Sequence, residues 1–110
     1  MVSKYISVKE KTLLNQHKYI LKKLVSSNDK DRRVIFENAP IELFQALRML
    51  FKLLVHKKLS LTNLQEKKLA AHKQLIRSTS DLKRVGELQR KLIRYRRGVT
   101  SILRVVLPAI

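Results

Sequence analysis

The chain has 110 residues, enough for one domain, and carries 25 Lys and Arg against 8 Asp and Glu, a formal net charge of +17. It has no Cys, two Gly and two Pro, which excludes a disulfide framework, a thiolate metal site, a Cys nucleophile and a Gly-rich phosphate loop. Hydrophobic residues make up 45 %, too many for a disordered basic tail, and the excess positive charge indicates a polyanionic partner.

The N-terminal sequence predicts neither export nor membrane insertion. Met1 to Tyr5 leads into a mixed polar segment without the apolar core of a signal peptide. No stretch approaches the roughly 20 apolar residues that a spanning helix needs. We therefore expect a protein made in the cytosol, where the absence of Cys is also suitable.

Helical periodicity begins with two helices in the first 38 residues. Ser7 and Glu10 stand at capping-box spacing, and apolar residues recur behind them at helical spacing as far as Val25. The polar run at 26–29 predicts a stop and a new start. A short second helix is expected over 29–38, with acidic residues in its first turn, where the helix dipole favours them.

The third expected helix, from Pro40 to about Lys57, is the most apolar part of the chain. Proline suits the first turn of a helix because its missing N–H has no partner there in any case. The apolar residues of this helix are Ile41, Leu43, Phe44, Leu47, Leu50, Phe51 and Leu54. Few polar residues solvate its other side, so we expect it to be the central, most buried helix.

Two further helices are expected after a connection at 59–62. Thr62 and Gln65 have capping-box spacing, and the helix behind them is expected to reach about Ile76. Its inward residues are expected to be Leu64, Leu69, Leu75 and Ile76. The last helix begins in the polar turn at 78–81 and ends at Gly98 or continues to Pro108. Its apolar line consists of Leu82, Val85, Leu88, Leu92, Tyr95 and Val99.

No strand pattern or hairpin turn competes with these helices. The sequence therefore predicts an all-α fold, a compact bundle of about five helices with a basic C-terminal helix and an apolar tail. Residues 1–98 are expected to form the helical domain and residues 99–110 the tail.

Positive charge is concentrated in the second half, where residues 56–110 carry +11 and residues 1–55 carry +6. Basic residues of the last helix fall on one stripe opposite its apolar line, with Glu87 as the only acid among them. Because like charges at i,i+4 repel, this stripe favours bound phosphate over a merely solvated face. The candidate nucleic-acid-binding residues are Lys83, Arg84, Arg90, Lys91, Arg94, Arg96 and Arg97.

The size of the charge favours nucleic acid over a small anion. A net charge of +17 matches the phosphates of about eight base pairs of duplex. No recognition helix or zinc module is evident, so we expect contacts to the phosphate backbone and not to base edges. Tyr95 lies on the apolar line and is expected in the core, with stacking on a base as the alternative.

The segment Val99–Ile110 is strongly apolar and carries a single charge, Arg104. Three roles are open for it. It packs back onto the domain, docks to capsid proteins, or lies at a membrane surface, since a basic helix followed by an apolar end is typical of membrane-surface segments.

No constellation in the sequence predicts catalysis. His17, His56 and His72 lack acidic neighbours at metal-ligand spacing, and we expect His56 and His72 at helix surfaces or boundaries. No nucleophile, base and orienting group stand together. We therefore expect no enzyme activity, no cofactor and no metal.

From Val34 onward the layout resembles a family of small basic helical proteins. The resembling segments are Asn38-Ala39-Pro40 with Glu42-Leu43, then Leu59-Ser60-Leu61 leading to Gln65, Leu69 and His72-Lys73, and finally a basic helix, Gly98 and Leu107-Pro108-Ala109. The family belongs to Polinton/Maverick elements and the related adintoviruses, which are adenovirus-like double-stranded DNA elements. Where the family's tail has a Gly-Gly-Phe-Leu-Pro character, this chain keeps only Gly98 and Leu107-Pro108, further apart.

By analogy with adenovirus core proteins, the resemblance implies a protein that packages genomic DNA or lies inside the capsid. The charge argument leads to the same expectation, a non-enzymatic DNA-binding and DNA-condensing protein of the virion interior. During assembly it would be found in the host nucleus or cytoplasm. The alternatives are a structural protein that cements capsid subunits and a membrane-active virion peptide.

Overall fold

The computed structural model describes residues 8–109, which contain seven α-helices and a short 3₁₀ helix and no strand. The helices are α1 (Val8–Ser26), α2 (Asp29–Asn38), α3 (Ile41–Val55), α4 (Asn63–Ala70), α5 (Lys73–Ser80), α6 (Val85–Arg94), α7 (Arg96–Val106) and η1 (Leu107–Ala109). The all-α fold class is confirmed. The number of about five helices is wrong, because each of the last two expected helices is broken once.

Local signals explain where two of the helices begin. The Asn28 side chain accepts a hydrogen bond from the backbone N–H of Asp31 at 2.9 Å and caps α2. The predicted capping box of α4 is confirmed, since Thr62 and Gln65 each accept a hydrogen bond from the other's backbone N–H. The capping box expected at Ser7 and Glu10 lies outside the described residues and side chains.

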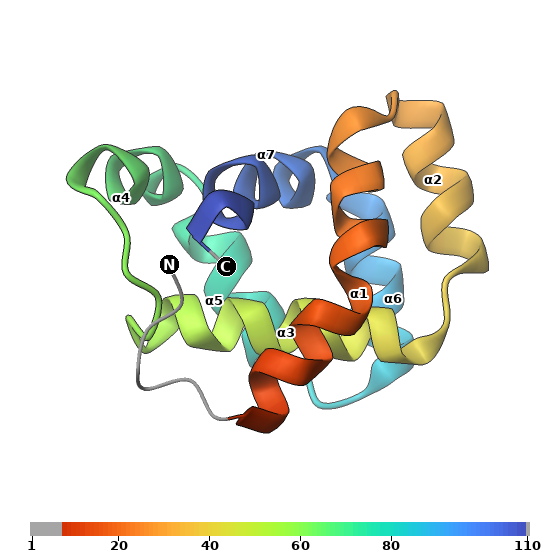
Figure 1. Ribbon diagram of the computed structural model, residues 1–110. Coiled ribbons are helices and arrows are strands. Elements are labelled where there is room, and N and C mark those ends of the chain that lie inside the picture. Colours follow the sequence, from red (N-terminus) through yellow and green to blue (C-terminus); the bar gives the residue numbers. More distant parts are fainter. Residues whose placement is uncertain (1–7, 110) are drawn as a thin grey trace.

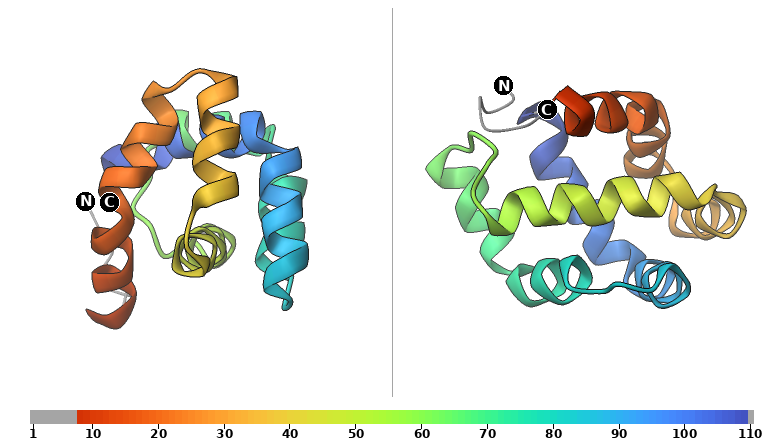
Figure 2. Two further views of the ribbon diagram at one scale, coloured as in Figure 1. Left: turned by 90° about the vertical axis from the view of Figure 1, so that its right-hand side faces the viewer. Right: turned by 90° about the horizontal axis from the view of Figure 1, so that it is seen from below.

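Helix α3 lies at the centre of the molecule, as its sequence predicts. Its buried residues are Leu43, Phe44, Ala46, Leu47, Leu50, Phe51 and Leu53. In the view from below, α3 crosses in front of α7 and the other helices surround this pair (Figure 2). Helices α1, α5 and α6 all pack against α3, and the stacked rings of Phe36 and Phe44, 6.1 Å apart, join α2 to it. The Cα radius of gyration of 12.8 Å agrees with the about 13 Å of a folded domain of this length.

The first unexpected break separates α4 from α5 at Ala71 and His72 (Figure 1). The two short helices have different partners, since α4 packs against α7 whereas α5 packs along α3. One straight helix to Ile76 could not reach both. The expected inward position of Leu64 is also wrong, because this side chain is 62 % exposed at the outer edge of α4.

The second break lies at Tyr95, whose backbone (φ −105°, ψ 28°) ends α6 and begins α7. Leu92 and Val99 on either side are buried, but Tyr95 is 46 % exposed, so its expected place in the core is wrong. Gly98 lies inside α7 and does not end it. A Cβ atom on Gly98 would stand 2.8 Å from Leu75 Cδ2, so a side chain at this position of α7 would displace the end of the Leu75 side chain on α5.

The segment expected as an apolar tail forms most of α7 and all of η1. Val99, Ile102, Leu103 and Val106 are fully buried in the same core as the leucines of α3. Helix α7 packs against α1, α2, α4 and α6, so within residues 8–109 these side chains are interior residues of the bundle. In the described part of the chain, no helix is both long enough and apolar enough to cross a membrane.

Candidate nucleic-acid interface

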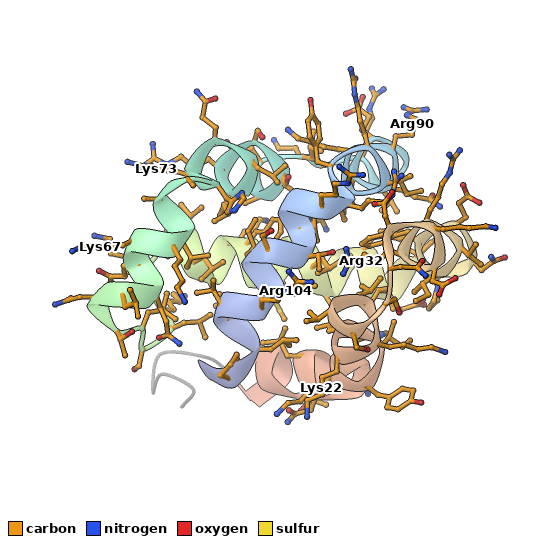
Figure 3. All side chains as sticks on the ribbon, turned by 90° about the horizontal axis from the view of Figure 1, so that it is seen from above. Lys22, Arg32, Lys67, Lys73, Arg90 and Arg104 are labelled. Atoms are coloured by element: carbon orange, nitrogen blue, oxygen red, sulfur yellow. The ribbon has the colours of Figure 1, made fainter. Side chains whose placement is uncertain are left out.

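The outward face of α6 carries the arginines that the sequence singles out. Leu88 and Leu92 are buried against the bundle, which leaves Arg90 and Arg94 on the exposed side of the helix. Figure 3 shows Arg90 directed away from the molecule at the end of the bundle formed by α6. A rigid helix thus presents two guanidinium groups to solvent, a suitable arrangement for phosphate oxygens.

Lys83 and Arg84 lie in the connection that precedes α6, and both are exposed. The Arg48 guanidinium, from α3, donates to the backbone oxygens of Leu82 at 3.0 Å and of Lys83 at 3.3 Å. A cation of α3 therefore holds the backbone that carries two candidate phosphate contacts. The side chains of Lys83, Arg84 and Arg90 have no hydrogen-bond or ion-pair partner within residues 8–109.

Lys91 and Arg96 make contacts inside the protein. The ammonium group of Lys91 donates to Ser78 Oγ and joins α6 to α5. The Arg96 guanidinium is 22 % exposed and donates to the backbone oxygen of Ile93 at 3.0 Å and to Asp29 Oδ2 at 2.8 Å. Arg96 therefore ties the start of α7 to the start of α2, and the structure gives it a positioning role.

Arg97, by contrast, is 85 % exposed, and its Nε lies 3.7 Å from Asp29 Oδ1. The hydrogen bond from Arg96 holds the pKa of the Asp29 carboxyl below its usual range; desolvation opposes this shift, and the charges of Arg96, Arg97 and Arg32 add to it. Asp29 thus stays ionised and anchors one arginine firmly. The contact between Arg97 and Asp29 is too long and too exposed to keep the Arg97 guanidinium from binding phosphate.

The break at Tyr95 brings an aromatic ring to the same surface. The Arg94 guanidinium lies over this ring, 5.7 Å from its centroid. A half-exposed tyrosine beside an arginine is a platform on which a nucleic-acid base can stack. Five of the predicted residues are exposed on α6, on the connection before it and on the first turn of α7. We call these residues, Lys83, Arg84, Arg90, Arg94 and Arg97, the α6 surface.

A second group of cations lies in a groove between α4 and α7. Lys68 and Arg104 line it together with His72 and with hydroxyl and amide side chains, and none of its lining residues is acidic. The groove has a volume of about 590 Å³, and Gln65 Nε2 crosses it to donate to the backbone oxygen of Val105 at 3.3 Å. Sequence reasoning missed this group because Arg104 is more than 30 residues away from Lys68 and His72.

Exposed cations are not confined to these two places. Figure 3 shows Lys22 on α1, Lys67 on α4 and Lys73 on α5 directed outward on other sides of the molecule. His56 is exposed at the end of α3 and His72 is half-buried at the start of α5, as their positions in the sequence predict. Within residues 8–109 no three His, Asp or Glu side chains stand close enough together to hold a metal ion.

No protein-family model, curated protein or solved structure matches this chain. The likeness to Polinton proteins therefore stays a prediction from the segments quoted above. The functional argument depends on the exposed cations and on their lack of internal partners.

Proposed function

We propose that this protein binds double-stranded DNA through the phosphate backbone, without sequence specificity, and condenses it as a non-enzymatic core protein inside a virion. One observation carries the proposal. Residues 82–97 contain seven bases and one acid, and five of those bases are exposed on the α6 surface. Like charges gathered on one surface repel one another, and a bound polyanion converts that cost into attraction.

The chain has too few acids to neutralise its bases internally. It holds 8 acids against 25 bases, and in the described part of the chain Arg96 pairs closely with Asp29 and Arg33 with Glu37, while Arg97 makes only a long contact with Asp29. Five phosphate contacts by the α6 surface predict a log–log salt slope of about −4.5. We expect the α6 surface to contribute more to DNA binding than any other surface of the protein.

Condensation, as distinct from simple binding, needs contacts on more than one side. Lys73 is directed away from α6 on another helix, and the groove between α4 and α7 adds Arg104 and Lys68. A molecule bound through α6 would still present these cations to a second duplex. The proposal makes no use of Val99–Val106, whose large apolar side chains are mostly interior residues of the bundle.

The test compares two variants that lose the same number of charges. Arg84→Ala/Arg90→Ala/Arg94→Ala removes three cations of the α6 surface, and Lys22→Ala/Lys52→Ala/Lys67→Ala removes three exposed cations of α1, α3 and α4. Duplex affinity is measured against salt concentration for several unrelated sequences. The first variant is expected to reduce the salt slope by about three for every sequence, and the control variant by about one or less.

Both variants are expected to melt at or above the wild-type temperature, because each removes like charges from a protein with an excess of them. Equal effects of the two variants would refute a dominant role for α6. Unchanged DNA affinity in the first variant would refute the proposal and favour a capsid-cementing or membrane-active role.

A further inference from the structure

An apolar groove lies where the end of α3, the connection at 59–62 and the helices α4 and α5 meet. Its floor consists of Leu54, Val55, Leu59, Leu61, Leu69 and Ile76. The groove has a volume of about 330 Å³, at the lower end of the roughly 300–1,000 Å³ of ligand pockets. It is separate from the α6 surface and shares no lining residue with the groove between α4 and α7.

The rim of this groove is charged and mainly positive. Lys57, Lys73 and Arg77 line it, against one carboxylate, Glu66, and all four residues are exposed. Lys73 and Arg77 stand one turn apart on α5, and Lys57 follows the end of α3. The cations thus come from two separate elements around an apolar floor.

The backbone at Lys57 is strained. Among the described residues, Lys57 alone combines a side chain with a positive φ, 52°. The N–H of Lys57 donates to the Leu54 oxygen at 3.2 Å and that of Lys58 to the Leu53 oxygen at 2.9 Å, the two hydrogen bonds of a Schellman motif. Glycine usually occupies this position because a Cβ atom disfavours the left-handed conformation. A lysine at this position lowers the stability of the backbone and adds a cation to the rim of the groove.

We propose that this groove is a docking site for a short segment of another protein that carries one or two bulky apolar side chains between carboxylates. A polynucleotide is too polar to match the apolar floor. Cations that come from two separate elements suit several carboxylates better than the single head group of a fatty acid. The first seven residues of this chain contain Lys4 and no acid, so their charge does not match the rim. The proposal does not rest on DNA binding.

The probe is a synthetic peptide, Glu-Glu-Phe-Leu-Glu-Glu, titrated into the full chain labelled for NMR. Binding is expected to shift the methyl signals of Leu59, Leu61 and Ile76 more than those of α7. Two control peptides separate the contributions, one with Ser-Ser in place of Phe-Leu and one with Lys in place of every Glu. Neither is expected to shift the groove methyl signals.

Matched charge reversals test the rim. Lys73→Glu is expected to weaken peptide binding about fivefold, whereas Lys67→Glu, an equal change on an exposed residue outside the groove, leaves it unchanged. Lys57→Gly is expected to raise Tm by about 2–4 °C while weakening binding. Because this variant is expected to be more stable than the wild type, its loss of affinity could not be attributed to unfolding.

Three results would overturn the proposal. The first is an absence of shifts at the groove methyl signals, and the second is an equal loss of affinity in Lys73→Glu and Lys67→Glu. The third is binding of sodium oleate, in place of the peptide, with the same shifts, which would assign the groove to a fatty acid.

Discussion

Replacement of the two glycines of the chain by alanine is expected to change stability differently, although both glycines lie in helices and neither has a positive φ. Gly86 stands in the first turn of α6 with no atom within 4 Å of the place where a Cβ would be. The Cβ of an alanine at Gly98 would stand 2.8 Å from Leu75 Cδ2 and 3.7 Å from His72 Nδ1. The same substitution therefore meets open space at one site and the ends of two neighbouring side chains at the other.

Gly86→Ala is expected to stabilise the fold by about 0.5–1 kcal/mol, because alanine restricts the unfolded chain and suits a helix. At Gly98 the same gain is offset by the displacement of the Leu75 methyl group, so we expect a net change close to zero. Gly98→Val places a branched side chain against both neighbours and is expected to destabilise by about 1–3 kcal/mol through overpacking.

Urea denaturation of the single variants and of a double-mutant cycle with Leu75→Ala measures these effects. Leu75→Ala removes the clashing methyl group, so Gly98→Ala in that background is expected to stabilise the protein as Gly86→Ala does. If Gly98→Ala stabilised the wild-type background as much as Gly86→Ala, the close contact between the Gly98 position and the Leu75 side chain would be refuted.

Three further predictions concern the core, the Asp29 anchor and the net charge. Leu47→Ala and Phe51→Ala, at fully buried positions of α3, are expected to cost about 2–5 kcal/mol in urea denaturation, and a loss below 1 kcal/mol in both would contradict a central α3. Since Arg96 lowers the Asp29 pKa, the carboxylate stabilises the fold above its unfolded pKa, and this stabilisation is lost as pH falls below about 4. Asp29→Asn is thus expected to melt below the wild type at pH 7, by a difference that shrinks as low pH protonates the Asp29 carboxylate, and a Tm difference independent of pH would refute the anchor. Because the net charge is +17, Tm is expected to rise between about 20 and 200 mM NaCl, and a fall would show that self-repulsion is unimportant.

Much of the architecture follows from the sequence alone. Three features depend on side chains within a few residues of each other, so they can be inferred without knowledge of the fold. They are the all-helical class, the start of α4 at the Thr62 capping box and the bounds of α2. The central position of α3 follows from an apolar surface too wide for one neighbour. The excess of basic residues is likewise a property of composition, since 8 acids cannot pair with 25 bases, and its concentration at residues 82–97 is visible in the sequence.

The breaks at His72 and Tyr95 were decided by tertiary structure. Apolar residues continue at helical spacing through both breaks, and periodicity does not register a bend that keeps the apolar residues on either side in the core. The bends form because α4 and α5 pack against different helices, and because α7 must turn from α6 to cross the bundle. Their consequences include the exposed ring of Tyr95 and the buried apolar side chains of the C-terminal segment.

The roles of individual arginines also depend on distant residues. Arg94, Arg96 and Arg97 are equivalent in the sequence, yet Arg96 alone meets both Asp29, 67 residues away, and the backbone oxygen of Ile93. Sequence determines how many cations the protein has and roughly where they gather. Only the packing of α2 against α6 and α7 decides which arginine is held internally and which remain open to phosphate, because a side-chain partner far along the chain leaves no trace in local spacing.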